Sequence, residues 1–293
     1  MKTVTEVLAA DAAEKVTETP ASVEPTTETQ TAPSAPMIIG IRKAKFQPPR
    51  IVLNAVEGWG KTSAAAYTPK PLLLMANGET GYDTLLGVGL VPEIAADVID
   101  NWKDLIALLE KLDAAESLPY KTIILDAMGG FEKMCHTMVC KRDFKGDWGE
   151  KGFGAFQRGY GVAVPEWIQM LAKLDRIRTK GVMIILLSHV KIGTFKNPSG
   201  NDFDRYAADL DKSTWGITHK WADAVLFGKF VTITEKDKGR SKGIGGVDRI
   251  LYTEYRDAYD AKNRYGMPDE IDIPNDPTKT WETIWKNIYK KPV

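Results

Sequence analysis

The feature that most constrains the fold is the stretch NAVEGWGKTSAA, which begins at Asn54. An apolar run, RIVLNA (Arg50–Ala55), leads into it, and the small residues of KTSAAAY follow it. A glycine-rich turn from a buried strand into a helix directs the unpaired amide groups of a helix N-terminus toward the edge of a sheet. The chain is therefore expected to contain a sheet with one strand that ends at this turn.

Further apolar runs alternate with longer amphipathic stretches. The runs are Pro71–Asn77, Lys121–Ala127, Val182–Val190, Asp223–Glu235 and Asp248–Tyr255. Continuous apolar runs are typical of strands buried on both faces, as in a parallel sheet. The expected helices are Lys61–Ala66, Asp97–Ala115, Phe131–Arg142, Val164–Thr179 and a C-terminal amphipathic helix in KTWETIWKNIYKK. This order predicts a three-layer α/β domain with a mostly parallel central sheet, in which the last two strands pair antiparallel.

Composition divides the chain into two parts. Residues 1–36 are rich in Thr, Glu, Ala, Pro and Ser, and acidic residues outnumber lysines there. Such a segment buries too little apolar surface to offset its ordering entropy, so we expect a disordered acidic tail over 1–36 and one folded domain over 37–293. The formal net charge of the chain is zero, which excludes recruitment of nucleic acid or membranes by a global field.

Neither a membrane span nor a secretory signal is evident in the sequence. No apolar run approaches the roughly 20 residues that cross a bilayer, and the N-terminus lacks the basic-then-apolar order of a signal peptide. Cys135 and Cys140 are interpreted as reduced thiols on a helix. We therefore expect a cytoplasmic protein with no membrane partner.

The glycine-rich turn ends in Gly60, Lys61 and Thr62, the last part of the pattern G-x-x-x-x-G-K-[ST], with Ala55 in place of the first glycine. In this pattern loop amides cradle phosphates, the lysine reaches the β- and γ-phosphates, and the hydroxyl binds Mg²⁺. Alanine is tolerated at the first position if φ is negative there. We therefore predict a site for ATP. Its expected nucleotide-binding residues are Glu57, Gly58, Trp59, Gly60, Lys61, Thr62 and Ser63.

Polar residues at the ends of three later runs complete the predicted site. Asp126 ends KTIILDA, and beside a phosphate loop this carboxylate is expected to hold Mg²⁺ together with Thr62. Glu79 follows PLLLMAN and either acts on the attacking water or is a turn residue of NGETG. Ser188 and His189 follow VMIILL; they either reach the γ-phosphate or are structural.

Taken together, these motifs resemble the RecA/DnaB-like branch of P-loop ATPases. More narrowly, the chain looks like the phage RecA-like ATPases grouped with the Sak single-strand annealing proteins. The resemblance covers about Met37 to Ile273 and rests on EGWGKTSAA, MANGETGYDTL, TIILDAM and LLSHVK. It implies a three-layer RecA-like P-loop NTPase that uses ATP and Mg²⁺. In that family the glutamate, here Glu79, activates water, and His189 belongs to a strand-end sensor.

A further match is YDAKNRYGMPDEI, which contains Lys262 and Arg264. In DnaB-like ATPases a Lys-x-Arg pair near this place reaches the γ-phosphate bound by a neighbouring subunit, where an arginine stabilises developing charge. The resemblance thus implies a homo-oligomer, ring or filament, whose active sites are completed between subunits. If the chain is phage-encoded, the expected location is the host cytoplasm.

The resemblance also places single-stranded DNA in the loops after the metal-binding strand and the strand that follows it. The corresponding stretches are Cys140–Gly161 and Lys191–Lys212, and the basic stretch Lys236–Gly243 is expected to be a hairpin tip or a phosphate contact. The first stretch interleaves cations with aromatic residues, the composition that single-strand binding requires. Its expected DNA contacts are Lys141, Arg142, Lys145, Lys151 and Arg158.

Two functions of different classes remain open. The first is an ATPase that acts on single-stranded DNA in recombination or annealing, with a single-strand-binding protein as a further partner. The second is a nucleotide-dependent assembly or switch module with a protein partner and little turnover. Glu79 and Arg264 favour the first, whereas Ala55 and the zero net charge favour the second. A small-molecule P-loop kinase is less consistent with the sequence, because no arginine-rich lid is evident.

Overall fold

The computed structural model describes residues 45–237 and 240–289. The expected acidic tail over 1–36 and the predicted start of the domain at residue 37 lie outside these residues.

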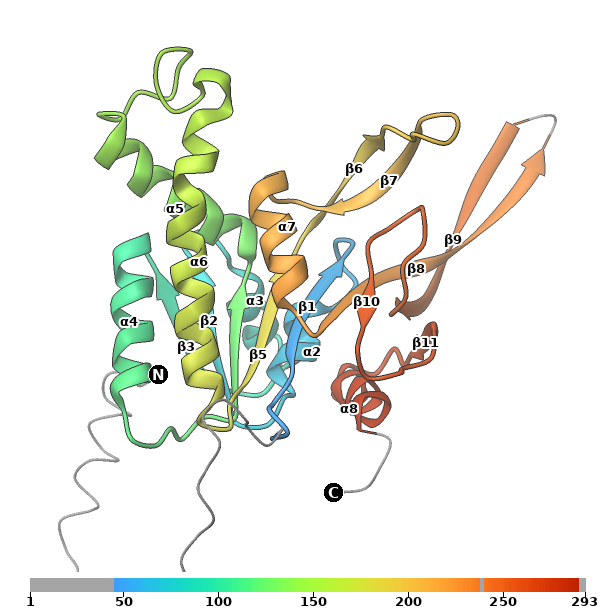
Figure 1. The fold of residues 1–293 in the computed structure, drawn as a ribbon. Helices are drawn as coiled ribbons and strands as arrows, with labels where there is room; N and C mark the ends of the chain where they lie inside the picture. Colours follow the sequence, from blue (N-terminus) through green and yellow to red (C-terminus); the bar gives the residue numbers. More distant parts are fainter. Residues whose placement is uncertain (1–44, 238–239, 290–293) are drawn as a thin grey trace, which may run out of the picture.

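A mixed sheet forms the middle layer of the described chain (Figure 1), with strand order β11-β9-β8-β1-β5-β4-β2-β3 and with β10 paired to β8. The parallel strands are β1 (Arg50–Ala55), β2 (Pro71–Ala76), β3 (Ala95–Ile99), β4 (Thr122–Asp126), β5 (Met183–Ser188) and β8 (Ala224–Asp237). The antiparallel strands are β9 (Arg240–Tyr252), β10 (Lys262–Asn263) and β11 (Glu270–Ile273). The predicted α/β class, the mostly parallel sheet and the antiparallel pairing of the last two long strands are confirmed.

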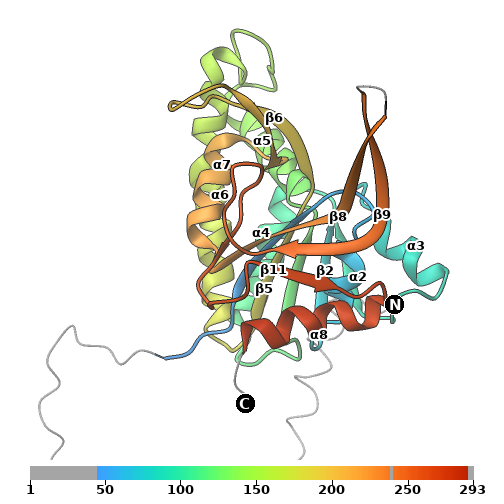
Figure 2. The same ribbon diagram turned by 90° about the vertical axis from the view of Figure 1, so that its right-hand side faces the viewer.

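Helices cover both faces of the sheet (Figures 1 and 2). One face carries α4 (Trp102–Ala114), α5 (Met128–Asp143), α6 (Arg158–Arg178) and α7 (Lys212–Trp221), and the other carries α2 (Lys61–Ala66), α3 (Gly81–Gly87) and α8 (Pro277–Ile288). Successive strand residues point to opposite faces, so Val52 packs with the first group while Ile51 and Leu53 pack with the second. No helix in the described part of the chain is long and apolar enough to cross a membrane.

Several element boundaries differ from the sequence-based expectation. The helix expected over Asp97–Ala115 begins only at Trp102, because the residues before it form the edge strand β3. The Asn101 side chain caps this helix by accepting hydrogen bonds from the backbone amides of Lys103 and Asp104. The helix expected from Val164 begins earlier, at Arg158. Local periodicity does not distinguish a short edge strand from the first turn of a helix.

Two hairpins and one helical connection extend beyond the carboxyl edge of the parallel strands (Figure 1). The stretch Lys191–Lys212, expected as a loop, contains the antiparallel ribbon of β6 (Val190–Phe195) and β7 (Phe203–Ala208). The described residues of the stretch Lys236–Gly243 belong to the paired strands β8 and β9, where Lys236 pairs with Ser241 and Asp237 with Arg240. The third extension is the connection between α5 and α6.

Candidate nucleotide site

The phosphate loop lies between β1 and α2, at the carboxyl edge of the sheet. Gly58 and Gly60 have φ angles of 73° and 100°, a backbone region in which a side chain is strained. Ala55 is the buried last residue of β1, and it is not among the residues with positive φ. Alanine therefore fits the position at which the sequence pattern usually has its first glycine.

Lys61, which is predicted to bind the β- and γ-phosphates, extends its side chain into the phosphate loop. Its Nζ donates a hydrogen bond to the backbone carbonyl of Ala55 at 3.0 Å. Burial lowers the pKa of Lys61, while the charges of Asp126, Glu57 and Glu79 act in the opposite direction. The ammonium is thus held among acidic groups at the position where bound phosphate would accept its hydrogen bonds.

Thr62 and Asp126 meet across two elements. The Thr62 hydroxyl at the start of α2 donates a hydrogen bond to Asp126 Oδ2, at the end of β4, over 2.6 Å. Burial raises the pKa of Asp126, whereas the Thr62 hydrogen bond and the Lys61 charge act to lower it. A hydroxyl and a carboxylate side by side supply the hard oxygen ligands that Mg²⁺ prefers. The two residues predicted to hold Mg²⁺ therefore fit that role.

Glu79 and His189 reach the same region from two other strand ends. Glu79 lies in the turn after β2, where its amide bonds to the Ala76 carbonyl at 2.9 Å, and His189 follows β5. Glu79 Oε1 is 4.0 Å from His189 Nε2. Glu79 also raises the pKa of Asp126 electrostatically, so it lies within range of the predicted metal ligand. Residues that follow or end β1, β2, β4 and β5 are thus brought together.

Ser188 does not join this group. Its side chain is fully buried, and its hydroxyl donates a hydrogen bond to the His189 carbonyl at 2.9 Å. Of the two alternatives, these contacts favour a structural role for Ser188. The alternation of strand residues between two faces explains why neighbours at one strand end do not both face the site.

Trp59 also differs from the expectation, because its side chain anchors the loop. The indole is fully buried, and its Nε1 donates a hydrogen bond to the Ile250 carbonyl at 3.3 Å. A Cβ on Gly228 of β8 would lie only 2.5 Å from the indole ring. Glycine at position 228 therefore leaves the space that the indole fills, and the side chain of Trp59 is unavailable to a nucleotide.

Arg249 supports the loop from behind, and sequence reasoning missed it. This buried β9 residue donates hydrogen bonds to the Trp59 carbonyl at 2.9 Å and to the Thr280 hydroxyl at 3.1 Å. Its guanidinium also lies over the Trp59 ring, 5.6 Å from the ring centroid. A Cβ on Gly60 would approach Arg249 Nη1 to 2.9 Å. Gly60 is therefore required for its backbone conformation, and a side chain there would also displace the Arg249 guanidinium.

Lys262 and Arg264 lie away from the phosphate loop of their own chain. Strand β10 pairs Lys262 with Val225, near the start of β8. The start of β8 lies beside the start of β1, because Ile51 pairs with Ala224. The phosphate loop follows the other end of β1, about four strand residues or about 13 Å away. Lys262 Nζ donates to the His219 carbonyl at 2.6 Å, and Arg264 pairs with Asp223 at 3.2 Å.

The predicted DNA-binding stretch Cys140–Gly161 is helical at both ends and has a small core of its own. Phe153 is fully buried, and its ring packs against those of Phe144, Trp148 and Tyr160. Although this stretch has the composition of a stacking surface, Phe153 therefore offers no free face to a base in this structure. Trp148 and Phe156 are the large aromatic residues that remain exposed in this stretch, at 50% and 103% of full exposure.

The five cations predicted to contact DNA differ in their surroundings. Arg142 forms ion pairs with Asp143 and Glu166, and Arg158 lies over the Phe144 ring. The remaining three are exposed and form no ion pair within residues 45–237 and 240–289: Lys141, Lys145 and Lys151. These lysines, and Arg158 beside its ring, therefore keep their charge available to a phosphate backbone, whereas the charge of Arg142 is paired.

Comparison of the sequence with known protein families gives a match that includes these motifs. A family model described as an AAA domain matches residues 47–265, which include the phosphate loop, Glu79, Asp126, His189 and Arg264. No curated protein matches the chain. One solved structure that matches is the crystal structure of the RadB recombinase, with a TM-score of 0.45 and 10% sequence identity, over 80% of this chain and 90% of that one. The family match spans more than half of the 293 residues, and the chain therefore belongs to the AAA domain family.

Proposed function

We propose that this AAA domain protein is a Mg²⁺-dependent, RecA-like ATPase that acts on single-stranded DNA in recombination or annealing. The observation that carries ATP hydrolysis is the convergence of Lys61, Thr62, Asp126 and Glu79 at one edge of the sheet. A module that only binds nucleotide has no use for a carboxylate beside its metal ligands. The narrower assignment to phage Sak-type proteins is part of this proposal.

Each residue has a distinct role in the proposed reaction. Lys61 binds the β- and γ-phosphates and stabilises the charge that develops on them. Thr62 and Asp126 would hold Mg²⁺, which supplies further neutralisation of phosphate charge. Glu79 orients the attacking water and accepts its proton. His189, whose Nε2 lies 4.0 Å from Glu79 Oε1, positions that carboxylate.

Arg264 is proposed to act on the nucleotide of a neighbouring subunit. Its position beside the start of β8 separates it from its own phosphate loop, so a catalytic role requires a second copy of the chain. The side chain is 57% exposed, and its acidic partner, Asp223, already pairs with Arg50 and Arg178. Release of Arg264 therefore leaves Asp223 neutralised.

Single-stranded DNA is proposed to bind along the carboxyl edge of the sheet. The β6–β7 ribbon, the β8–β9 hairpin and the α5–α6 connection all extend from this edge (Figure 1). Exposed Lys145 and Lys151 in the α5–α6 connection provide contacts for phosphates, and exposed Trp148 and Phe156 provide rings for stacking. The DNA would thus lie on the same edge as the nucleotide.

The first test is steady-state ATP hydrolysis with Mg²⁺, with and without a thymidine oligonucleotide, at low and moderate salt. We expect hydrolysis that single strands stimulate and that salt makes less responsive to DNA. Lys61→Ala should abolish hydrolysis, while Lys111→Ala, on an exposed face of α4, serves as the charge-matched control. Nucleotide binding without turnover by the wild-type protein would instead support the assembly or switch module.

A further inference from the structure

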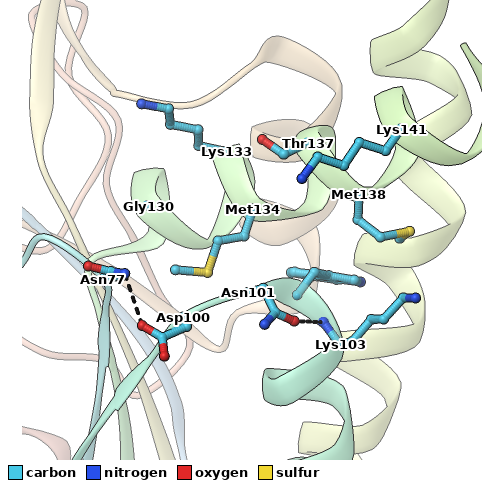
Figure 3. A pocket seen from close by; sticks show the side chains of 11 residues that line it. Asn77, Asp100, Asn101, Lys103, Gly130, Lys133, Met134, Thr137, Met138 and Lys141 are labelled. Carbon is cyan, nitrogen blue, oxygen red and sulfur yellow. Dashed lines mark hydrogen bonds between the residues drawn. The ribbon is translucent and has the colours of Figure 1, made fainter. Parts of the chain in front are cut away.

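A pocket of about 630 Å³ lies between α5 and the start of α4, outside the nucleotide site (Figure 3). The α5 wall carries Lys133, Met134, Thr137, Met138 and Lys141. These positions follow helical spacing, so they share one side of α5. Lys133, Thr137 and Lys141 form a polar row about 12 Å long, and the two methionines form an apolar row beside it.

The opposite wall comes from the end of β2 and the start of α4. It contributes Lys103, Asn77 and Asp100, and the amide of Asn77 donates a hydrogen bond to Asp100 Oδ1 at 2.9 Å. Figure 3 shows Met134 extending from α5 toward Asp100. Methionine side chains adapt to flat ring systems, because the thioether is flexible and polarizable. The pocket thus combines cationic rims with an adaptable apolar floor.

Positive charge dominates this pocket. Lys103, Lys133 and Lys141 are exposed, and in the part of the chain that the structure describes none of them forms an ion pair. Asp100 is the one carboxylate among the lining residues, and it already accepts the Asn77 hydrogen bond. Three ammonium groups against one carboxylate leave an excess of positive charge around this pocket, which favours an anionic ligand.

A second pocket, of about 300 Å³, lies on the neighbouring side of α5, and α4 does not line it. Lys133 and Thr137 line both pockets, and the second extends to His136 and the exposed Trp148. Its acidic lining residue, Glu132, accepts a hydrogen bond from the Asp211 amide at 3.0 Å. We call the two pockets together the α4–α5 groove. Its length and its exposed indole fit a chain of linked anions that carries aromatic rings better than they fit a lone phosphate.

We propose that the α4–α5 groove binds single-stranded nucleic acid. Its phosphates contact Lys103, Lys133 and Lys141, and its bases pack against Met134 and Trp148. The inference rests on the proposed DNA-dependent ATPase. It extends the DNA contacts already predicted for Lys141 and proposed for Trp148 to Lys103, Lys133 and Met134 on the helices beside them.

The groove also reaches the turn that carries the proposed catalytic glutamate. Asn77 lines the groove and lies two residues before Glu79 in the turn after β2. The backbone amide of Asn77 donates a hydrogen bond to the Ile99 carbonyl of β3 at 3.0 Å, and its side-chain amide donates one to Asp100. Nucleic acid that changes these Asn77 contacts would shift the turn that carries Glu79. This provides a route from bound nucleic acid to ATP hydrolysis.

The test is the binding of a fluorescein-labelled thymidine oligonucleotide by the full chain, followed by fluorescence anisotropy over a range of salt concentrations. For the double variant Lys133→Ala/Lys141→Ala we expect affinity to fall about tenfold or more and the salt slope to fall by about 1 to 2. Trp148→Ala should weaken binding about fivefold or more without changing the salt slope, because stacking involves no counterion release. Lys111→Ala is the matched control and should bind like the wild type.

The outcomes separate this inference from the proposed function. If the wild type binds the oligonucleotide and the double variant binds equally well, the groove assignment is overturned while the DNA-dependent ATPase stands. If the wild type hydrolyses ATP but binds no single strand, both the groove assignment and the DNA task are overturned. Displacement of the oligonucleotide by poly-L-glutamate at equal charge concentration would show a site for acidic polypeptide and overturn the nucleic-acid assignment. Resistance to that competitor, with loss of affinity in both groove variants, supports it.

Discussion

At the scale of single residues, the site depends on a few positions where one side chain excludes another. Gly60 leaves room for the Arg249 guanidinium, and Gly228 leaves room for the Trp59 indole. The loop is thereby fixed on the side that faces β8 and β9, while Glu57 and Gly58 remain exposed. A rigid support of this kind keeps Lys61 and Thr62 in place without ligand contacts of its own.

Glu79→Gln tests the role of the carboxylate in hydrolysis. The amide keeps the size of the side chain but cannot accept a proton, so we expect the turnover rate to fall about 10²-fold or more while ATP affinity changes little. Steady-state hydrolysis and binding of a fluorescent ATP analogue measure the two quantities. Asp83→Asn on the exposed side of α3 is the matched control. A normal turnover rate in Glu79→Gln would exclude Glu79 as the base.

Gly228→Ala tests the packing beneath the phosphate loop. The added methyl group would lie 2.5 Å from the Trp59 ring, and we expect the free energy of unfolding to fall by about 1–3 kcal/mol. Urea denaturation measures the change. Gly216→Ala on α7 is the control, because no heavy atom lies within 4 Å of the added Cβ and alanine favours helix. Equal stability of Gly228→Ala and the wild type would show that the indole moves aside freely.

At the scale of elements, a charged network ties the amino-terminal ends of β1 and β8 to the end of α6. Asp223 accepts hydrogen bonds from Arg50 at 2.9 Å and from Arg178 at 2.9 Å, and Arg50 also pairs with Asp175 at 3.1 Å. Burial acts to raise the pKa of Asp223, but the bonds and charge of Arg50 outweigh it, so the pKa is lowered. The network lies opposite the nucleotide edge and holds strands whose other ends form the site.

Asp223→Asn should destabilise the protein in a pH-dependent way. A lowered pKa in the folded state means that the ionised carboxylate stabilises the fold above the unfolded pKa of about 3.9, and that this stabilisation is lost as pH falls through the folded pKa. We expect a loss of about 2 kcal/mol at pH 7, below the range for a fully buried pair because the arginines are partly exposed. The difference from the wild type should shrink at pH 3.

Urea denaturation at pH 7 and pH 3 makes this comparison. Asp269→Asn is the control, because Asp269 and its partner Arg256 are both more than half exposed and such pairs contribute little. An equal loss for Asp223→Asn at both pH values would show that the side chain acts through its shape and hydrogen bonds rather than through its charge.

At the scale of the whole molecule, the proposed ATPase requires more than one copy of the chain. Arg264 lies beside the starts of the parallel strands, and the phosphate loop lies at their ends. No movement of one side chain spans that separation, about 13 Å along the strands alone. A head-to-tail assembly, in which one subunit's strand starts approach the next subunit's strand ends, would bring the two together.

Arg264→Ala should lower turnover on the order of 10³-fold while leaving ATP affinity nearly unchanged. Arg256→Ala, at an exposed arginine paired with Asp269, is the matched control. Mixing Arg264→Ala with Glu79→Gln subunits should restore part of the activity, because some interfaces then contain both intact residues. Absence of recovery in oligomers shown to be mixed would contradict a role in a neighbouring site.

Much of the candidate nucleotide site could be proposed from the sequence because its signals are local. Lys61 and Thr62 follow a glycine turn, and Glu79 and Asp126 follow or end apolar runs, so each position could be assigned without knowing its neighbours. The role of Ser188 stayed open, because its position at a strand end does not reveal which face its side chain occupies. The burial of Phe153 was not predictable for a related reason: aromatic residues in a stacking surface and in a small core have the same composition.

The sequence by itself determined the α/β class, the phosphate loop and the residues at the strand ends, since hydrophobic runs and glycine turns act over a few residues. The tertiary structure alone decided that Arg249 and Gly228 support the loop, that α4 and α5 enclose a cationic groove, and that Arg264 lies far from its own nucleotide site. These features depend on contacts between segments far apart in the chain. Arg249 lies 190 residues beyond Trp59, and only the close packing of the folded chain brings such residues together.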